Sequence, residues 1–308
     1  MITEIPSEND FSKASLNLLN LAWATSIQTL KDLRDADSEW VNEITTEYWE
    51  KCQPILGNAL TLIQQAQEMA IKGRIASVSP YLLIMRDVRD WPKNSDKENA
   101  SFSEFKTLDA SDLVKVHDSV SAMSFDEDFK RLFNEVRVQR NQIIHQGRAG
   151  SKINIIDIVA NIIKTASKLH SDKSWVSHRR LFLENDNIAT AHSIDHVDYV
   201  VLDEFQIVTD LLEPAFCKKY LGFDKKTRSY ICPQCWYHSH DHYTYDEDLP
   251  KLAKLLPNSP SSTKVYCLTC EQTSVVERRK CVECKGNVIS DNQSGPADRC
   301  LSCAAHQS

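Results

Sequence analysis

Glycine is scarce in this sequence, and the glycine-rich motifs of two large enzyme classes are absent. Only seven glycines occur among 308 residues. Neither G-x-G-x-x-G, which marks dinucleotide-binding folds, nor G-x-x-x-x-G-K-[ST], which marks P-loop proteins, is present. The sequence therefore argues against a Rossmann-type oxidoreductase and against a P-loop nucleotide hydrolase.

Long apolar runs and an excess of basic residues are also absent. No apolar run approaches the ~20 residues that a bilayer-spanning helix needs, and Met1–Asp10 lacks the basic and apolar segments of a secretion signal. The formal net charge of −7 argues against a protein that coats DNA with a broadly basic surface. We therefore predict a cytoplasmic protein without membrane association, whose cysteines stay reduced.

Apolar residues in the first half of the chain recur with helical spacing, which predicts a mainly α fold. We expect a helix that starts near Phe11, behind N-cap candidates at Ser7–Asp10, and a core helix over 154–169. Pro54 is expected to end one helix, and Ser124 to cap another. Further expected helices cover residues 40–52, 55–71, 81–88 and 125–146.

Three segments are expected along the chain. The helices described above predict a bundle over residues 1–175, because long helices joined by short loops pack in this way. Residues 176–222 are typical of a helical connector that Pro214 interrupts. Residues 223–308 contain short β-prone stretches beside paired cysteines, which predicts a small β-rich region with two zinc ribbons.

Four Cys-x-x-Cys pairs are clustered in this last segment. The two-residue spacing lets both sulfurs of a pair face one metal ion, and eight thiolates complete two tetrahedral zinc sites. Closed four-thiolate sites leave no open coordination position, so we expect two structural Zn²⁺ ions. The expected ligands are Cys232, Cys235, Cys267, Cys270, Cys281, Cys284, Cys300 and Cys303.

The spacing leaves the pairing of these cysteines open. Sequential pairing is the simplest, and crossed pairing, as in cross-brace folds, is the alternative. His238, His240 and His242 follow the first pair and are alternative ligands, although eight cysteines already complete two sites. The basic clusters at 225–228 and 278–280 are candidates for contact with phosphate, or else form a solvated face.

A second pattern, Arg140-Asn141-Gln-Ile-Ile-His145, lies near the end of the helix expected over 125–146. Positions 141 and 145 are one turn apart on one face, and position 140 lies about 100° round the helix. A guanidinium binds phosphate through two hydrogen bonds, and an imidazole that titrates near neutral pH transfers protons. This set suits cleavage of RNA by its own 2′-hydroxyl. A solvated helix end, with His145 favoured by the helix dipole, is the alternative.

At these residues, and in its helical pattern over about residues 10–170, the chain resembles the HEPN superfamily. Members are helical bundles with an Arg-x4–6-His motif, most typically with a polar residue such as Asn after the Arg. The resemblance implies a metal-independent endoribonuclease in which two protomers pair so that both motifs line one cleft. It implies catalytic roles for Arg140 and His145, assisted by Asn141, on an RNA substrate. Family members act in antiviral defence, toxin–antitoxin systems and RNA processing, and some keep the bundle without activity.

The sequence therefore leaves two candidate functions. The first is an endoribonuclease homodimer that leaves 2′,3′-cyclic phosphate ends, with zinc ribbons that position RNA or a regulatory protein partner. The second is a non-catalytic module on a helical dimer, in which the ribbons bind nucleic acid or dock a protein. Substitution of Arg140 and His145 distinguishes them, because only the first needs both side chains.

Overall fold

The computed structural model describes residues 1–35, 41–85, 87–146, 152–185, 194–239, 249–291, 295 and 297–307, with backbone alone at 41–44, 144–146, 194–196 and 239. The chain divides into two compact units, Met1–Asp172 and Lys173–Ser308, which are taken one at a time below. The first is built mainly from helices, and the second combines helices with a small sheet. The predicted mainly α class with a small β-rich C-terminal region is confirmed.

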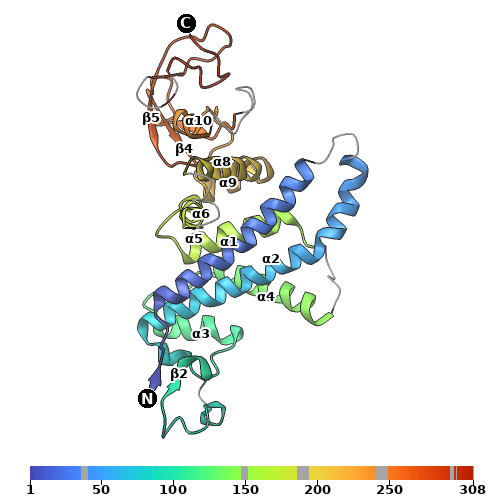
Figure 1. Cartoon of the computed structure of the whole chain (residues 1–308), viewed down its shortest axis with the longest axis vertical. Coiled ribbons are helices and arrows are strands. Elements are labelled where there is room, and N and C mark those ends of the chain that lie inside the picture. Colours follow the sequence, from blue (N-terminus) through green and yellow to red (C-terminus); the bar gives the residue numbers. More distant parts are fainter. Residues whose placement is uncertain are drawn as a thin grey trace. The chain divides into compact units, whose positions relative to one another are not determined.

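The first unit is built on two long helices that pack along one another (Figure 1). Helix α1 spans Glu8–Arg34 and helix α2 spans Val41–Val78. The N-cap of α1 is Ser7, whose hydroxyl accepts a hydrogen bond from the amide of Asp10, while the Asp10 carboxylate accepts one from the Ser7 amide. This reciprocal capping box satisfies two amides that would otherwise lack partners, and it fixes where α1 begins.

The prediction of two helices around Pro54 is wrong, because α2 runs through it without a break. An internal proline removes one helical hydrogen bond and costs about 3 kcal/mol. Here α2 packs against four other helices of the unit, and this burial outweighs the local cost. The neighbouring Gln53 also accepts a hydrogen bond from the amide of Ile153 at 2.8 Å, which ties this part of α2 to the residues before α5.

Three further helices complete the bundle, and they surround α2. They are α3 (Ala110–Val120), α4 (Glu127–Gln146) and α5 (Ile155–Leu169). Each contacts α2, and α5 also contacts α1. Helix α5 follows the prediction closely, since Asn154 caps it and its apolar face is buried. The core of the unit includes Leu19, Trp23, Ile27, Leu56, Leu60, Ile63, Ile71, Ile75, Leu83, Leu113, Phe129, Val159 and Ile162.

Other details of the first unit differ from the sequence-based expectations. Helix α3 was not expected. Helix α4 is capped by Asp126, whose carboxylate accepts from the amide of Phe129 at 2.8 Å, and not by Ser124. In place of the helix expected over 81–88, residues 80–83 form a 3-10 turn, and Ile84 then pairs with Thr107 in an isolated β-bridge. The short elements are η1 (Pro80–Leu83), η2 (Val88–Asp90), η3 (Phe102–Glu104) and the parallel pair β1 (Ile2–Thr3) and β2 (Ala100–Ser101).

The second unit begins with helices α6 (Trp175–Glu184), α8 (Ile194–Leu211) and α9 (Pro214–Tyr220). Helix α6 lies at the start of the stretch that was expected to be a helical connector, residues 176–222. Pro214 interrupts the helical run as predicted, and α9 starts at this proline. The helices expected as a connector therefore lie in the same compact unit as the paired cysteines.

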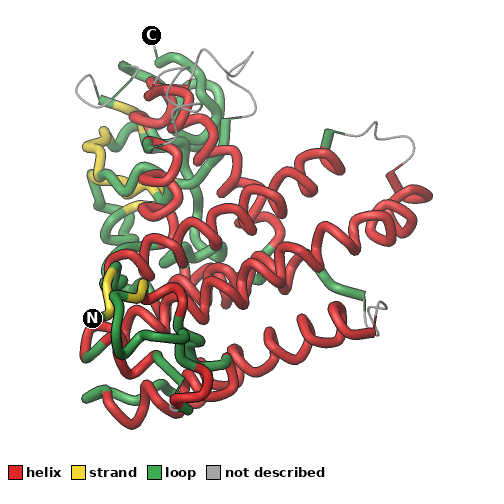
Figure 2. The backbone as a smooth tube through the Cα atoms, turned by 60° about the horizontal axis from the view of Figure 1, so that its bottom comes forward, coloured by secondary structure: helices red, strands yellow, loops and turns green. Residues whose placement is uncertain are grey.

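A four-stranded antiparallel sheet and helix α10 (Pro233–Ser239) complete the second unit, and Figure 2 marks the strands in yellow. The strands are β3 (Ala253–Leu255), β4 (Lys264–Cys267), β5 (Thr273–Glu277) and β6 (Ile289–Ser290), paired in this order. Burial alternates along β4 and β5, as expected for strands with one face packed on the core. The second Cys-x-x-Cys pair lies at the end of β4 and in the turn that leads to β5.

Candidate functional site

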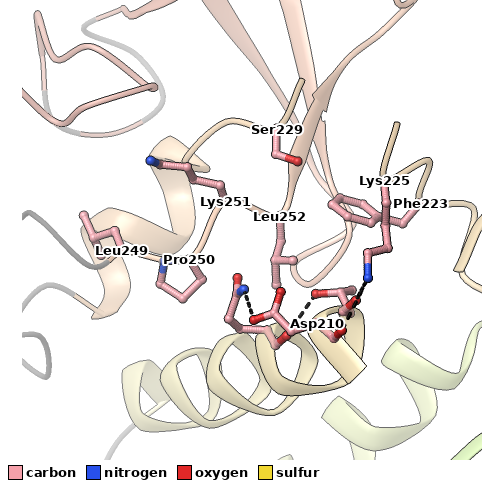
Figure 3. Close-up of a pocket in the computed structure, with 10 residues that line it drawn as sticks. Asp210, Phe223, Lys225, Ser229, Leu249, Pro250, Lys251 and Leu252 are labelled. Atoms are coloured by element: carbon pink, nitrogen blue, oxygen red, sulfur yellow. Dashed lines mark hydrogen bonds between the residues drawn. The ribbon is translucent and has the colours of Figure 1, made fainter. Parts of the chain in front are cut away.

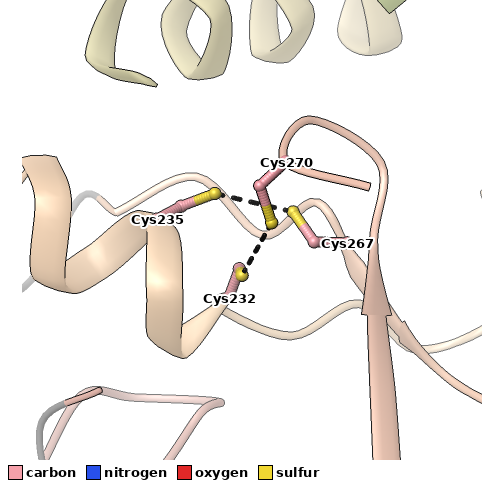
Figure 4. Close-up of side chains that lie close together, drawn as sticks. All are labelled: Cys232, Cys235, Cys267 and Cys270. Atoms are coloured by element: carbon pink, nitrogen blue, oxygen red, sulfur yellow. Dashed lines mark hydrogen bonds between the residues drawn. The ribbon is translucent and has the colours of Figure 1, made fainter. Parts of the chain in front are cut away.

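Four sulfurs from two distant segments meet in what we call the first cysteine group: Cys232, Cys235, Cys267 and Cys270 (Figure 4). Cys232 precedes α10 and Cys235 lies in its first turn, whereas Cys267 ends β4 and Cys270 lies in the turn that follows. The sulfur atoms of Cys232 and Cys270 are 3.7 Å apart, as are those of Cys235 and Cys267. All four lie within 4.8 Å of one another.

The second cysteine group contains Cys281, Cys284, Cys300 and Cys303, also within 4.8 Å of one another. The sulfur of Cys281 lies 3.7 Å from that of Cys303, and the sulfur of Cys284 lies 3.8 Å from that of Cys300. The structure thus groups the cysteines sequentially, with the first two pairs together and the last two together. The crossed pairing is not observed among these eight cysteines.

Both groups have the dimensions of a tetrahedral metal site. Four sulfurs at ~2.3 Å from a central zinc are ~3.8 Å from one another, and the observed separations are 3.7 Å and 3.8 Å. Hydrogen bonding with Cys232 and the other two cysteines of the group, together with burial, raises the pKa of Cys235 well above its usual value. Four crowded thiols cannot all ionise without a cation, so each group is suited to a thiophilic divalent ion.

Polar side chains of α6, of α8 and of the turn after β4 surround the first cysteine group. The hydroxyl of Thr269 lies 3.2 Å from the sulfur of Cys267 and 3.4 Å from that of Cys235. Arg180 of α6 donates to the carbonyl of Thr269 at 3.2 Å and pairs with Asp198 of α8. Burial lowers the pKa of Arg180, but Asp198 and the nearby thiols raise it more, so the guanidinium remains a cation beside the group. A positive charge here offsets the excess negative charge of a four-thiolate site.

The second cysteine group is shaped by backbone amides and by a glycine. The amide of Gly286 donates to the sulfur of Cys284 at 3.1 Å, and the amide of Glu283 donates to that of Cys281 at 3.3 Å. A Cβ atom on Gly286 would lie 3.0 Å from the sulfurs of both Cys284 and Cys300. Glycine is therefore needed at this position, because any side chain would push against two ligand atoms.

The two ribbons pack against each other within the second unit. The amide of Ile231 donates to the carbonyl of Leu301 at 2.8 Å, which joins the first ribbon to the second. Ile231, Trp236, Leu249 and Ala304 form one buried apolar cluster. Damage to the second ribbon is therefore expected to loosen the packing of residues next to the first.

The basic clusters that were candidates for phosphate contact are largely engaged within the protein. Lys225 lies in a cavity of about 430 Å³, where its ammonium points at the end of α8 and donates to the carbonyls of Thr209 and Leu212 (Figure 3). Positive charge at a helix C-terminus is stabilising, which explains this placement. Similar internal contacts are made by Arg228 to Ser302, by Arg278 to the carbonyl of Ser262, and by Arg279 to Glu277 and Asp298.

The histidines considered as alternative ligands are placed only in part. His238 lies in α10, and its Nδ1 is 3.9 Å from a carboxylate oxygen of Asp198. In the described part of the chain, the first cysteine group contains four sulfurs and no imidazole. His240 and His242 lie outside the described residues.

Arg140 and Asn141 lie near the C-terminal end of α4, as predicted. The guanidinium of Arg140 donates from Nη1 to the side-chain oxygen of Asn141 at 3.1 Å. Ile143 packs against α2, where a Cβ on Gly57 would be 3.5 Å from it. The backbone of His145 belongs to the last turn of α4, and its side chain lies outside the described residues.

A polar stripe on α2 near Arg140 was missed in the sequence. It consists of Gln64, Glu68 and Lys72, whose spacing of four residues places them on one face of α2. Gln64 donates to the carboxyl group of Glu68. Burial raises the pKa of Glu68, although Lys72, Arg140 and the hydrogen bond from Gln64 act to lower it. The four-residue spacing of polar side chains in a largely apolar helix is the signal that could have revealed this stripe.

One nitrogen of Arg140 has no hydrogen-bond partner within this arrangement. Its Nε is buried, and no acceptor reaches it among the residues that the structure describes. A buried donor without a partner is uncommon in folded proteins, and the Nε of Arg278 is another in the described residues. Since this nitrogen is buried, it is closed to a ligand in the described structure.

None of the described helices combines the length and apolar character that crossing a membrane requires. Comparison of the chain with protein-family models, with curated proteins and with solved structures gives no match.

Proposed function

We propose that the protein is a metal-independent endoribonuclease of the HEPN type. The observation that carries the proposal is the contact between Arg140 and Asn141 at the end of α4, one helical turn before His145. Two structural Zn²⁺ ions, one in each cysteine group, hold the ribbons of the second unit together. These closed sites stabilise the fold and take no part in the reaction.

In the proposed reaction, the 2′-hydroxyl of the RNA attacks the adjacent phosphorus while His145 accepts its proton. The bond from phosphorus to the 5′-oxygen breaks, and that oxygen receives a proton. Arg140 neutralises the negative charge that builds on the phosphorane oxygens, and Asn141 orients the guanidinium through their hydrogen bond. The products are a 2′,3′-cyclic phosphate and a free 5′-hydroxyl.

One imidazole per chain cannot remove one proton and deliver another at the same moment. Two protomers that pair along their motifs would supply two imidazoles to one cleft. We therefore propose that the active form is a homodimer. Its setting is the cytoplasm, in antiviral defence or a toxin–antitoxin system.

The ribbons act first as a scaffold in this proposal. Several of their cations are already bonded to carbonyls or carboxylates of the protein, which leaves less free charge for the RNA backbone. Contact of the ribbons with RNA or with a regulatory protein therefore relies on shape and on the remaining polar groups.

The test compares wild type with Arg140→Ala and His145→Ala on total RNA, without added divalent metal. We expect wild type alone to cleave and to leave 2′,3′-cyclic phosphate ends. Arg137→Ala is the matched control, because Arg137 lies one turn earlier on α4 and bonds to Asn134 outside the motif. Equal cleavage by all four proteins would refute the assignment. RNA binding without cleavage by wild type would favour the non-catalytic alternative.

A further inference from the structure

The two cysteine groups differ in how far their sulfurs are shielded from solvent. In the first group, Cys232, Cys235 and Cys267 are each at most 2% exposed, and Cys270 is partly exposed. In the second group Cys303 is exposed, and Cys281 and Cys284 are partly exposed. A small oxidant in solution therefore reaches the second group without any opening of the fold.

Within the second group, the sulfurs of the partly exposed Cys281 and the exposed Cys303 are 3.7 Å apart. The opposite contact joins Cys284 to Cys300, and Cys300 is fully buried. Cys281 also accepts hydrogen bonds from the amide of Glu283 and, at 3.4 Å, from the side chain of Gln307. These contacts hold the Cys281 sulfur beside Cys303, where it can attack a sulfenic acid that forms on that residue.

We propose that Cys281 and Cys303 form a peroxide-sensitive modification site, and that their oxidation to a disulfide releases the metal of the second group while the first group keeps its own. The site does not depend on the ribonuclease assignment. It rests on the exposure of Cys303, its separation from Cys281 and the contrast with the first group, in which three of the four cysteines are buried.

The chemistry needs only a peroxide as oxidant. The Cys303 thiolate attacks one oxygen of hydrogen peroxide, the O–O bond breaks, hydroxide leaves and a sulfenic acid forms. The Cys281 thiolate then attacks the sulfenic sulfur, the S–O bond breaks, and a second hydroxide leaves as the disulfide forms. Two thiolates lose two electrons, and one peroxide gains them. The group then has two thiolates instead of four, too few to hold the ion tightly.

The expected structural consequence is local. Ala304, next to Cys303, packs in the cluster that contains Trp236, and the guanidinium of Arg299 lies 5.7 Å from the Trp236 ring centroid. Loosening of the second ribbon is therefore expected to expose Trp236. Helices α6 and α8 and the first group remain folded, since Arg180, Asp198 and Thr269 hold them together.

The experiment treats the full-length, metal-loaded protein with hydrogen peroxide. It measures released metal with a chromogenic chelator and maps disulfides by mass spectrometry. We expect one of the two metal equivalents to leave, together with a Cys281–Cys303 disulfide, and a dithiol to reverse both changes. The proposal is overturned if both metals leave together, or if the disulfide joins cysteines of the first group. It is also overturned if peroxide that oxidises free glutathione leaves the protein unchanged, or if the protein binds no metal.

Two variants separate oxidation from simple loss of a ligand. Cys303→His keeps four ligands, since three cysteines and one histidine are a common zinc set, but it cannot form the disulfide. We expect it to bind metal and to resist peroxide. Cys270→His makes the same exchange in the first group and should leave the Cys281–Cys303 oxidation intact. Peroxide-driven metal release from Cys303→His at the wild-type rate would contradict the proposal. If a variant misfolds, the disulfide map of the wild-type protein still tests the proposal.

Discussion

Arg179 of α6 and Glu204 of α8 form a doubly hydrogen-bonded ion pair in the interior of the second unit. Nε of Arg179 is 2.9 Å from one carboxylate oxygen, and Nη2 is 2.7 Å from the other. Both side chains are only 4% exposed. Fork-to-fork geometry of this kind fixes the angle between the two helices as well as their distance.

Removal of one partner of this pair should strongly destabilise the second unit. Arg179→Ala removes the guanidinium that binds the buried Glu204 carboxylate, and we expect a loss of about 3–5 kcal/mol in the free energy of unfolding. Urea unfolding followed by circular dichroism measures it. Arg89→Ala is the control, since the pair of Arg89 with Asp87 is exposed and should contribute nothing measurable. Equal effects of the two substitutions would show that the buried pair is not structural.

Gly286→Ala should weaken the second metal site and leave the first unchanged. The added Cβ would meet two ligand sulfurs at 3.0 Å, so the group can no longer close around an ion. We expect roughly a 10–100-fold loss of metal affinity, the range typical of disturbed surroundings of a metal site. Competition with a chelator measures this affinity. Gly57→Ala is the control, because its Cβ makes only ordinary contacts and both metals should be retained.

Glu68→Gln should remove a pH-dependent loss of stability from the first unit. Because burial raises the folded-state pKa of Glu68, the folded protein holds this proton more tightly than the unfolded chain does. Stability should then fall as pH rises from the unfolded-state pKa, about 4.3, through the raised folded-state pKa. Unfolding curves at several pH values should show that the free energy of unfolding of wild type falls relative to that of Glu68→Gln over this window. Above the window the difference should stay constant. A constant difference between the two proteins would contradict the expected sign.

Lys254 should make the second unit more stable as pH rises through the alkaline range, which is the opposite direction to the effect of Glu68 in the first unit. Burial lowers the pKa of its ammonium to about 8, while the nearby Asp224 raises it. The unfolded chain binds this proton more tightly, with a pKa of about 10.4. Stability should therefore rise between these two values. The rise should be smaller in Lys254→Met, and denaturation midpoints across this pH range compare the two proteins. Parallel curves would rule out a lowered pKa for Lys254.

Several features of the first unit could be predicted from sequence because they depend on local spacing. The core helix after Asn154 and the position of Arg140 and Asn141 near the end of α4 follow from helical periodicity. The continuation of α2 through Pro54 could not be predicted. A local rule ends a helix at proline, whereas the packing of α2 against four helices, far apart in sequence, outweighs that rule.

The candidate sites likewise have some features that the sequence predicts and others that only the packing determines. The spacing within each Cys-x-x-Cys pair by itself indicated metal binding, because two residues between cysteines place both sulfurs toward one ion. Which pairs meet, and which group is exposed, depended on how the strands and the two ribbons pack. The use of Lys225 to cap α8 and the approach of Glu68 to Arg140 likewise arise between segments distant in sequence. The local chemistry of each motif thus follows from the sequence alone. The tertiary structure determines which residues are partners, which are buried and how their charges balance, because these depend on contacts between segments that are far apart in the chain.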